Sequence, residues 1–191
     1  MRFSRSHVSH HCWFIFVMLA FLLTDGAFGA PTSVCRAAQL LQLAAPHSGP
    51  RVGRAAIAFN LQTLDGKAVT LDTFRGKPLV VNFFASWCDP CREEMPLINE
   101  IAAKGAKDGY NVLGIAVDDS RAAVSEFASE SKLVFPIALD LNSTVKRAYR
   151  IFGPPATFFI DSQGTIRDIV LGPITGQSAR AALNKAGIAT N

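Results

Sequence analysis

Apolar stretches alternate with polar turns along the chain, and their spacing predicts alternating strands and helices. The almost unbroken apolar run at 78–85 is typical of a central strand that is buried on both faces. Beyond Trp87 the apolar residues recur at helical spacing, which predicts a long helix after that strand. The same patterns predict further strands at 59–64, 68–71, 111–117, 133–139, 156–160 and 166–171, and helices at 120–131, 142–150 and 178–185. Strands that alternate with helices and end in a hairpin predict an α/β fold with a mostly parallel sheet and added antiparallel strands.

Local turn and cap signals support this assignment of elements. Asp65-Gly66 separates the first two strands and is a strong hairpin signal. The sequence Asp-Ser-Gln-Gly at 161–164 predicts a turn into the last strand. Ser120 stands where a helix N-cap is expected, because its hydroxyl can accept a free backbone N–H of the first turn.

The N-terminus has the layout of a secretory signal peptide. Arg2 and Arg5 precede an apolar run at 12–23, and small residues follow a break at Thr24-Asp25-Gly26. Cleavage after Gly29 would give a signal peptide of residues 1–29. An uncut membrane anchor is the alternative, although a span needs about 20 apolar residues and Asp25 ends this run early. Both interpretations predict an exported protein, at the periplasm or the outer face of the cytoplasmic membrane, with membrane contact only if the segment is retained.

Composition predicts one folded domain behind this segment. Residues 30–54 are interpreted as a linker with a short helix at 35–45, because proline, serine and glycine follow that helix closely. Residues 55–191 form the predicted domain, and 49% hydrophobic against 18% charged residues excludes extended disorder. The formal charge of +4 is spread over scattered basic residues without interleaved aromatic residues. We therefore expect no nucleic-acid partner.

Four cysteines divide by their spacing into two isolated residues and one pair. Cys12 lies inside the predicted signal and Cys35 in the linker, where an inert thiol, a second disulfide partner and a dimer bridge are all open. Cys88 and Cys91 form Cys-Asp-Pro-Cys between the buried strand and its helix. This offset puts the first sulfur at the helix N-terminus, where the helix dipole and unpaired N–H groups lower a thiol pKa from about 8.5. Cys88 is therefore the expected nucleophile and Cys91 the resolving thiol.

Metal and haem sites fit this pair poorly. A zinc site needs a second pair of ligands, but every histidine lies at or before His47. Covalent haem attachment needs histidine directly after the second cysteine, where this chain has Arg92. We therefore expect redox chemistry with no metal and no other cofactor, and a purely structural disulfide is the remaining alternative.

Around the pair, the sequence WCDPCREEMP at 87–96 resembles the active-site segment of the TlpA/ResA/CcmG group of exported thioredoxin-like proteins. The resemblance covers about residues 55–185 and includes Leu64-Asp65-Gly66-Lys67, Val81-Asn82-Phe83 and Phe158-Phe159-Ile160-Asp161. It implies a thioredoxin-like fold, with a central mixed sheet flanked by helices, an N-terminal β-hairpin and a helix–strand insertion that ends at 133–139. It also implies a thiol–disulfide oxidoreductase.

The same resemblance implies roles for two more residues, Glu94 and Pro155. Glu94 matches a buried acidic residue of the group, and a carboxyl group in an apolar site has a raised pKa and could take the proton of Cys91. A solvated helix carboxylate beside Glu93 is the alternative. Pro155 matches the cis-proline that faces the cysteines, although Pro154 before it departs from the usual pattern. Trp87 is expected to cover the active site, with core packing as the alternative.

The implied function is reduction of disulfides in exported proteins, for example during maturation of cytochrome c or of an oxidase copper site. The expected partners are protein substrates with disulfides or dithiols and a membrane-linked dithiol electron donor. Asp89 disfavours the nearby thiolate slightly, which favours a reductant. Two alternatives are a thiol peroxidase of the same fold and a copper chaperone. The first usually has Thr-x-x-Cys where this chain has Ala85-Ser86-Trp87, and the second needs a histidine ligand that the chain lacks after Cys91.

Overall fold

The computed structural model describes residues 49–189, so the predicted signal peptide and most of the predicted linker, with Cys12 and Cys35, lie outside the described residues. Its strands are β1 (Asn60–Thr63), β2 (Ala68–Thr70), β3 (Leu79–Phe84), β4 (Asn111–Val117), β5 (Ile137–Asp140), β6 (Ala156–Ile160) and β7 (Ile166–Leu171). Its helices are η1 (Leu71–Phe74), α3 (Asp89–Asp108), α4 (Arg121–Glu130), α5 (Thr144–Ala148) and α6 (Gly176–Lys185). No helix among residues 49–189 is both long and apolar enough for a membrane span.

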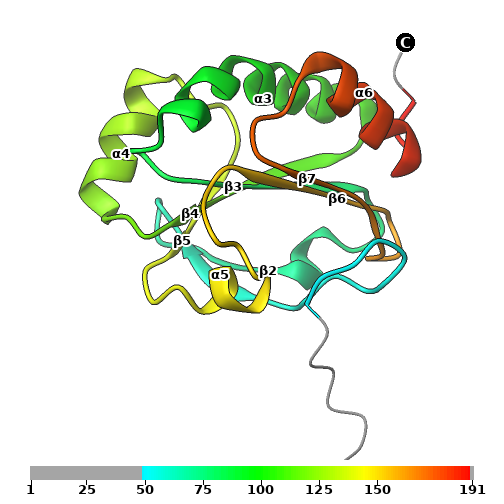
Figure 1. Ribbon diagram of the computed structural model, residues 1–191, viewed down its shortest axis with the longest axis horizontal. Helices are drawn as coiled ribbons and strands as arrows, with labels where there is room; N and C mark the ends of the chain where they lie inside the picture. Colours follow the sequence, from blue (N-terminus) through cyan, green and yellow to red (C-terminus); the bar gives the residue numbers. More distant parts are fainter. Residues whose placement is uncertain (1–48, 190–191) are drawn as a thin grey trace, which may run out of the picture. The chain divides into compact units, whose positions relative to one another are not determined.

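The strands form one mixed sheet in the order β2-β1-β5-β4-β3-β6-β7 (Figure 1). The strands β3, β4 and β5 are parallel, so their carboxyl ends lie at the same edge. On one side β6 pairs antiparallel with β3 and β7 pairs antiparallel with β6, and on the other side β1 pairs antiparallel with β5 and β2 pairs antiparallel with β1. This arrangement confirms the predicted mixed sheet with its N-terminal hairpin.

Two apolar layers enclose the sheet. All six residues of β3 are buried, and alternate side chains of a strand point to opposite faces. Val80 and Phe84 face the layer formed by α3, α4 and α6, whereas Phe83 faces the layer that contains α5 (Figure 1). In the second layer the Phe83 ring lies 5.2 Å from Tyr149 and 5.6 Å from Phe158, between ring centroids. The central strand is therefore held on both faces, which fixes the position of the residues that follow it.

Most predicted elements are confirmed to within one residue at each end, and three differ by two residues or more for local reasons. The strand predicted at 133–139 begins only at Ile137, because Pro136 has no N–H to extend the ladder. The helix predicted at 142–150 spans only Thr144–Ala148, because the Asp140 carboxylate accepts the N–H groups of Thr144 and Lys146 and so fixes its first turn. The helix predicted at 178–185 begins two residues earlier, since the Thr175 side chain accepts the N–H of Ser178 as an N-cap.

The first described residues are already attached to the sheet. Gly53 donates its N–H to Ile166 at 2.8 Å, and Ile166 donates to Arg54 at the same distance. Ala56 donates to the carbonyl of Gly164, also at 2.8 Å. These bonds fasten residues 53–56 to the start of β7, at the junction of the predicted linker and domain.

Candidate active site

The Cys-Asp-Pro-Cys segment lies at the carboxyl end of β3, where the chain turns into α3. Cys88 is the N-cap residue of this helix and has an extended backbone. Pro90 lies in the first turn of the helix, where its missing N–H costs no hydrogen bond because N–H groups of the first turn have no partner within the helix. The Cys88 carbonyl accepts the N–H groups of Cys91 and Arg92, both at 3.1 Å. The Cys88 sulfur also accepts the Cys91 N–H at 3.3 Å. Sequence and geometry thus place the first sulfur at the positive end of the α3 dipole.

Cys88 and Cys91 are joined by a disulfide, with an S–S distance of 2.07 Å and their Cα atoms 5.2 Å apart. Cys88 is 4% exposed, whereas Cys91 is completely buried. Both residues are thus buried in the oxidised protein, and Cys88 is the one that keeps some contact with solvent. This difference in access is what an ordered exchange, with one attacking and one resolving thiol, requires.

Trp87 lies outside the core, 58% exposed, which argues against the alternative that it packs in the interior. Its ring Nε1 donates to the carbonyl of Asp118 at 3.0 Å, just beyond the carboxyl end of β4. Asp118 has a φ of 50°, a conformation that costs energy in a non-glycine residue. Its carboxylate accepts hydrogen bonds from Lys146 and Ser143, which lower its pKa and hold this turn in place. The indole of the residue before Cys88 is thereby tied to the turn after β4.

Arg92 fixes the start of α3, a role that the sequence did not reveal. Its Nε donates to the Ser86 carbonyl at 3.0 Å, and its guanidinium lies 4.8 Å from the centre of the Phe127 ring. Glu130 completes an exposed ion pair with it at 3.7 Å. The backbone of Ser86 is also held by the segment that follows β4, since its N–H donates to Asp119 at 2.6 Å. The loop before Cys88 is thus restrained by α3 and by the segment after β4.

Glu94 is buried one turn beyond Cys91 and is 4% exposed, unlike the solvated carboxylate that was the alternative. Its Oε1 accepts the side-chain amide of Asn82 and its Oε2 accepts the backbone N–H of Ile174, both at 2.8 Å. Burial raises the pKa of this carboxyl above its usual range, and the two hydrogen bonds oppose that rise only in part. A group of this kind can exchange a proton nearer neutrality than an exposed glutamate.

Asn82 and Thr157 complete this buried cluster, and neither was predicted as a site residue. They are cross-strand partners on β3 and β6, and both are fully buried. The Asn82 amide donates to the Thr157 hydroxyl at 3.0 Å as well as to Glu94. A sequence signal was present, because Asn82 is the one polar residue of β3.

The peptide bond between Pro154 and Pro155 is cis, as the resemblance implies. The antiparallel register pairs Ala156 with Phe83, so the Pro155 loop lies at the sheet edge from which Cys88 begins α3. The Pro155 carbonyl accepts the N–H of Gly172 at 2.9 Å, which joins this loop to the end of β7. Large apolar side chains are exposed on both segments, with Phe152 97% exposed and Leu171 76% exposed.

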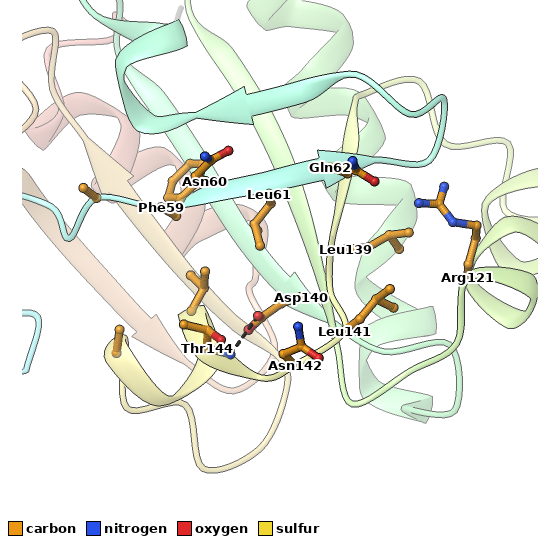
Figure 2. Close-up of a pocket in the computed structure, with 13 residues that line it drawn as sticks. Phe59, Asn60, Leu61, Gln62, Arg121, Leu139, Asp140, Leu141, Asn142 and Thr144 are labelled. Carbon is orange, nitrogen blue, oxygen red and sulfur yellow. Dashed lines mark hydrogen bonds between the residues drawn. The ribbon is translucent and has the colours of Figure 1, made fainter.

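A separate groove of about 540 Å³ lies between β1, β5 and α5 (Figure 2). None of the predicted site residues lines it. The charged groups in its wall already have partners, since Asp140 caps α5 and Arg121 donates to the carbonyls of Thr63 and Leu64. Within the described part of the chain, no three histidine, cysteine, aspartate or glutamate side chains are grouped so that they could hold a metal ion.

Known proteins with similar sequences share this cysteine chemistry. The family model AhpC/TSA matches residues 52–169. The thiol-disulfide oxidoreductase ResA of Oceanobacillus iheyensis is 36% identical over 138 residues, which are 70% of this chain and 72% of the relative. ResA of Geobacillus kaustophilus is 37% identical over 124 residues, 65% of this chain and 71% of the relative.

Solved structures agree with the sequence relatives. A thiol:disulfide interchange protein of the thioredoxin family from Chlorobium tepidum matches with a TM-score of 0.63 and 28% identity, over 73% of this chain and 99% of that one. This similarity confirms the predicted thioredoxin-like fold. The chain therefore belongs to the AhpC/TSA family and is a thiol–disulfide oxidoreductase of the ResA type.

Proposed function

We propose that this oxidoreductase works in the cell envelope and reduces disulfides of exported proteins through the Cys88–Cys91 dithiol. The observation that carries the proposal is a disulfide between Cys88, at the N-terminus of α3, and a completely buried Cys91, with the buried carboxyl group of Glu94 one turn away. The export signal predicted at 1–29 supports the location. The ResA relatives support protein substrates that carry disulfides or dithiols.

In the first step, the Cys88 thiolate of the reduced protein attacks one sulfur of the partner disulfide. A bond forms between that sulfur and Cys88, the partner S–S bond breaks, and the second partner sulfur leaves as a thiolate. The N–H of Cys91, which lies 3.3 Å from the Cys88 sulfur, and the α3 dipole stabilise the attacking thiolate. Asp89 in the first turn opposes this stabilisation and so favours a reducing protein.

In the second step, Cys91 gives its proton to Glu94 and attacks the Cys88 sulfur. The Cys88–Cys91 bond forms, the bond to the partner breaks, and the partner leaves with both sulfurs reduced. Two electrons have then passed from the protein to the partner. A membrane-linked dithiol donor restores the reduced protein by the same exchange in reverse. By resemblance, the substrates are apocytochrome c or the cysteines of an oxidase copper site.

A redox titration of the Cys88–Cys91 pair against glutathione or dithiothreitol buffers tests the direction of electron flow. We expect a potential near that of thioredoxin, about −270 mV, because a reductase must give up its electrons readily. A potential near about −120 mV, at the DsbA end of the range, would contradict the proposal. Hydrogen peroxide consumption with a thiol donor is measured in parallel. Consumption above the uncatalysed rate would favour the thiol peroxidase instead.

The exposed side chains around the Pro155 loop support a place for the partner polypeptide. A mixed disulfide brings the partner Cα within about 6–7 Å of the Cys88 Cα, so the partner must cover the surface at this sheet edge. Phe152, with 97% of its surface exposed, and Leu171 offer apolar area there. Aromatic side chains of this kind contribute strongly when a partner buries them.

Phe152→Ser should therefore slow exchange with a disulfide-bonded protein such as insulin by about tenfold, and leave exchange with glutathione disulfide unchanged. The measurement is the second-order rate constant for each substrate. Val134→Ser is the matched control, because Val134 is also exposed but contacts Asn99 far along α3. Equal slowing with both substrates, or equal slowing in the control, would argue against this docking surface.

A further inference from the structure

Asn82 is a buried amide in the centre of an otherwise apolar strand. It is completely buried, and its neighbours on the same face of β3 are Val80 and Phe84. Burying an amide costs free energy unless its N–H and C=O groups are hydrogen-bonded. Both amide hydrogens are in use, one toward Glu94 at 2.8 Å and one toward Thr157 at 3.0 Å.

The carbonyl oxygen of the same amide has no partner. Among buried side-chain nitrogen and oxygen atoms of residues 49–189, Asn82 Oδ1 alone lacks a hydrogen bond. Turning the amide over would point Oδ1 at the Glu94 carboxylate and leave the two amide hydrogens unpaired instead. The observed orientation needs a hydrogen-bond acceptor at Glu94 Oε1, and an ionised carboxylate accepts more strongly there than a protonated carboxyl group.

We propose that Asn82, oriented by Thr157, is a positioning residue that holds Glu94 in its ionised, proton-accepting form beside Cys91. This inference rests on the proposed function and deepens it. The Ile174 N–H occupies the other carboxylate oxygen, so both oxygens of Glu94 accept one bond each. Protonation would weaken Glu94 as the acceptor of these two hydrogen bonds, so both donors favour the ionised form. The cluster therefore favours the passage of the Cys91 proton onward, to the departing partner thiolate.

The hydrogen bonds from Asn82 and from the Ile174 amide favour the ionised form of Glu94, whereas the other groups around it are neutral, exposed or paired elsewhere. On α3, Cys88 and Cys91 become titratable only when their disulfide is reduced, and Arg92 and Glu93 are exposed. Strands β3 and β6 present neutral Asn82 and Thr157, and β7 and α6 carry the ion pair between Asp168 and Lys185. The pKa of Glu94 is raised by burial and lowered by the Ile174 and Asn82 hydrogen bonds, with no charged side chain among these causes.

The test measures the titration of Glu94 directly, by carbon-13 NMR of protein labelled at its glutamate carboxyl groups. Glu94→Gln assigns the signal. Asn82→Ala should move the Glu94 midpoint to higher pH, because a hydrogen bond that favours the ionised form is lost. Thr157→Val, which keeps the volume but removes the hydroxyl, should move it in the same direction by less. Thr157→Ser keeps the hydroxyl and should restore the wild-type midpoint.

A kinetic measurement connects the titration to the reaction. A mixed disulfide of Cys88 with glutathione is prepared, and the rate at which Cys91 resolves it is followed against pH. Asn82→Ala should slow resolution by about tenfold near neutrality and shift the profile to higher pH. In the Glu94→Gln background the same substitution should cause no further slowing, because Asn82 acts through Glu94.

Two results separate this inference from the proposed function. An unchanged Glu94 midpoint in both Asn82→Ala and Thr157→Val would overturn the role of Asn82, whatever the kinetics show. Resolution that is equally fast in Glu94→Gln would instead remove Glu94 from the proposed mechanism, even if its midpoint moved as expected. If Asn82→Ala does not fold, the Thr157→Val and Thr157→Ser pair decides the inference alone.

Discussion

Replacing Cys91 by serine will stop exchange at the mixed disulfide, and replacing Cys88 by serine will abolish exchange. Cys88 is the more exposed residue of the pair and stands at the N-terminus of α3, so without it a partner disulfide meets no activated nucleophile. With Cys91→Ser the first step still occurs, but no second thiol can release the partner. Turnover should fall below about a thousandth of the wild-type rate in both variants.

Mass spectrometry distinguishes the two variants. After mixing with a disulfide-bonded protein, Cys91→Ser should carry one covalently attached partner that a strong reductant removes, whereas Cys88→Ser should carry none. The reduced wild-type protein serves as the control and should release its partner completely. A stable adduct on Cys91 in the Cys88→Ser variant would contradict the assigned order of attack. The adducts collected by Cys91→Ser from a cell envelope extract would also identify the natural substrates.

Glu94→Gln should slow resolution of the mixed disulfide by about 10²-fold near neutrality, because the proton of Cys91 loses its acceptor. The first step, attack by Cys88, should change little, since Glu94 does not assist it. Stopped-flow kinetics that separate formation from decay of the mixed disulfide measure both steps. A uniform slowing of both would indicate a structural effect of the substitution rather than loss of a proton acceptor.

Glu94 should also make the free energy of unfolding depend on pH. Because burial raises the pKa of Glu94, the folded protein binds more protons than the unfolded chain between the usual pKa and the raised one. Its free energy of unfolding should therefore fall as pH rises through that window, and the loss should be absent below the usual pKa. Glu94→Gln should lack this fall. Chemical denaturation of the oxidised proteins across that range checks the difference, and parallel curves would contradict it.

The sequence predicted those parts of the site that are local in the chain. The apolar run before Cys88, the helical spacing after it and the cysteine offset all lie within thirty residues, so pattern alone locates the disulfide. The setting of Glu94 depends instead on Asn82 and on Ile174, which is 80 residues away, and Thr157 lies 75 residues from Asn82. Glu94 was predicted only by family resemblance, because its spacing fits an exposed helix position beside Glu93 equally well. Periodicity cannot show which distant strand supplies a donor.

The distribution of these donors limits how far the active-site motif can be transferred between proteins. The ten residues at 87–96 contain both cysteines and the carboxyl group, but the groups that bond to the carboxyl group come from β3 and from the loop before α6. A scaffold given these ten residues alone would acquire a disulfide without an equivalent proton acceptor. In evolutionary terms, the motif therefore has to be inherited together with β3 and the loop before α6.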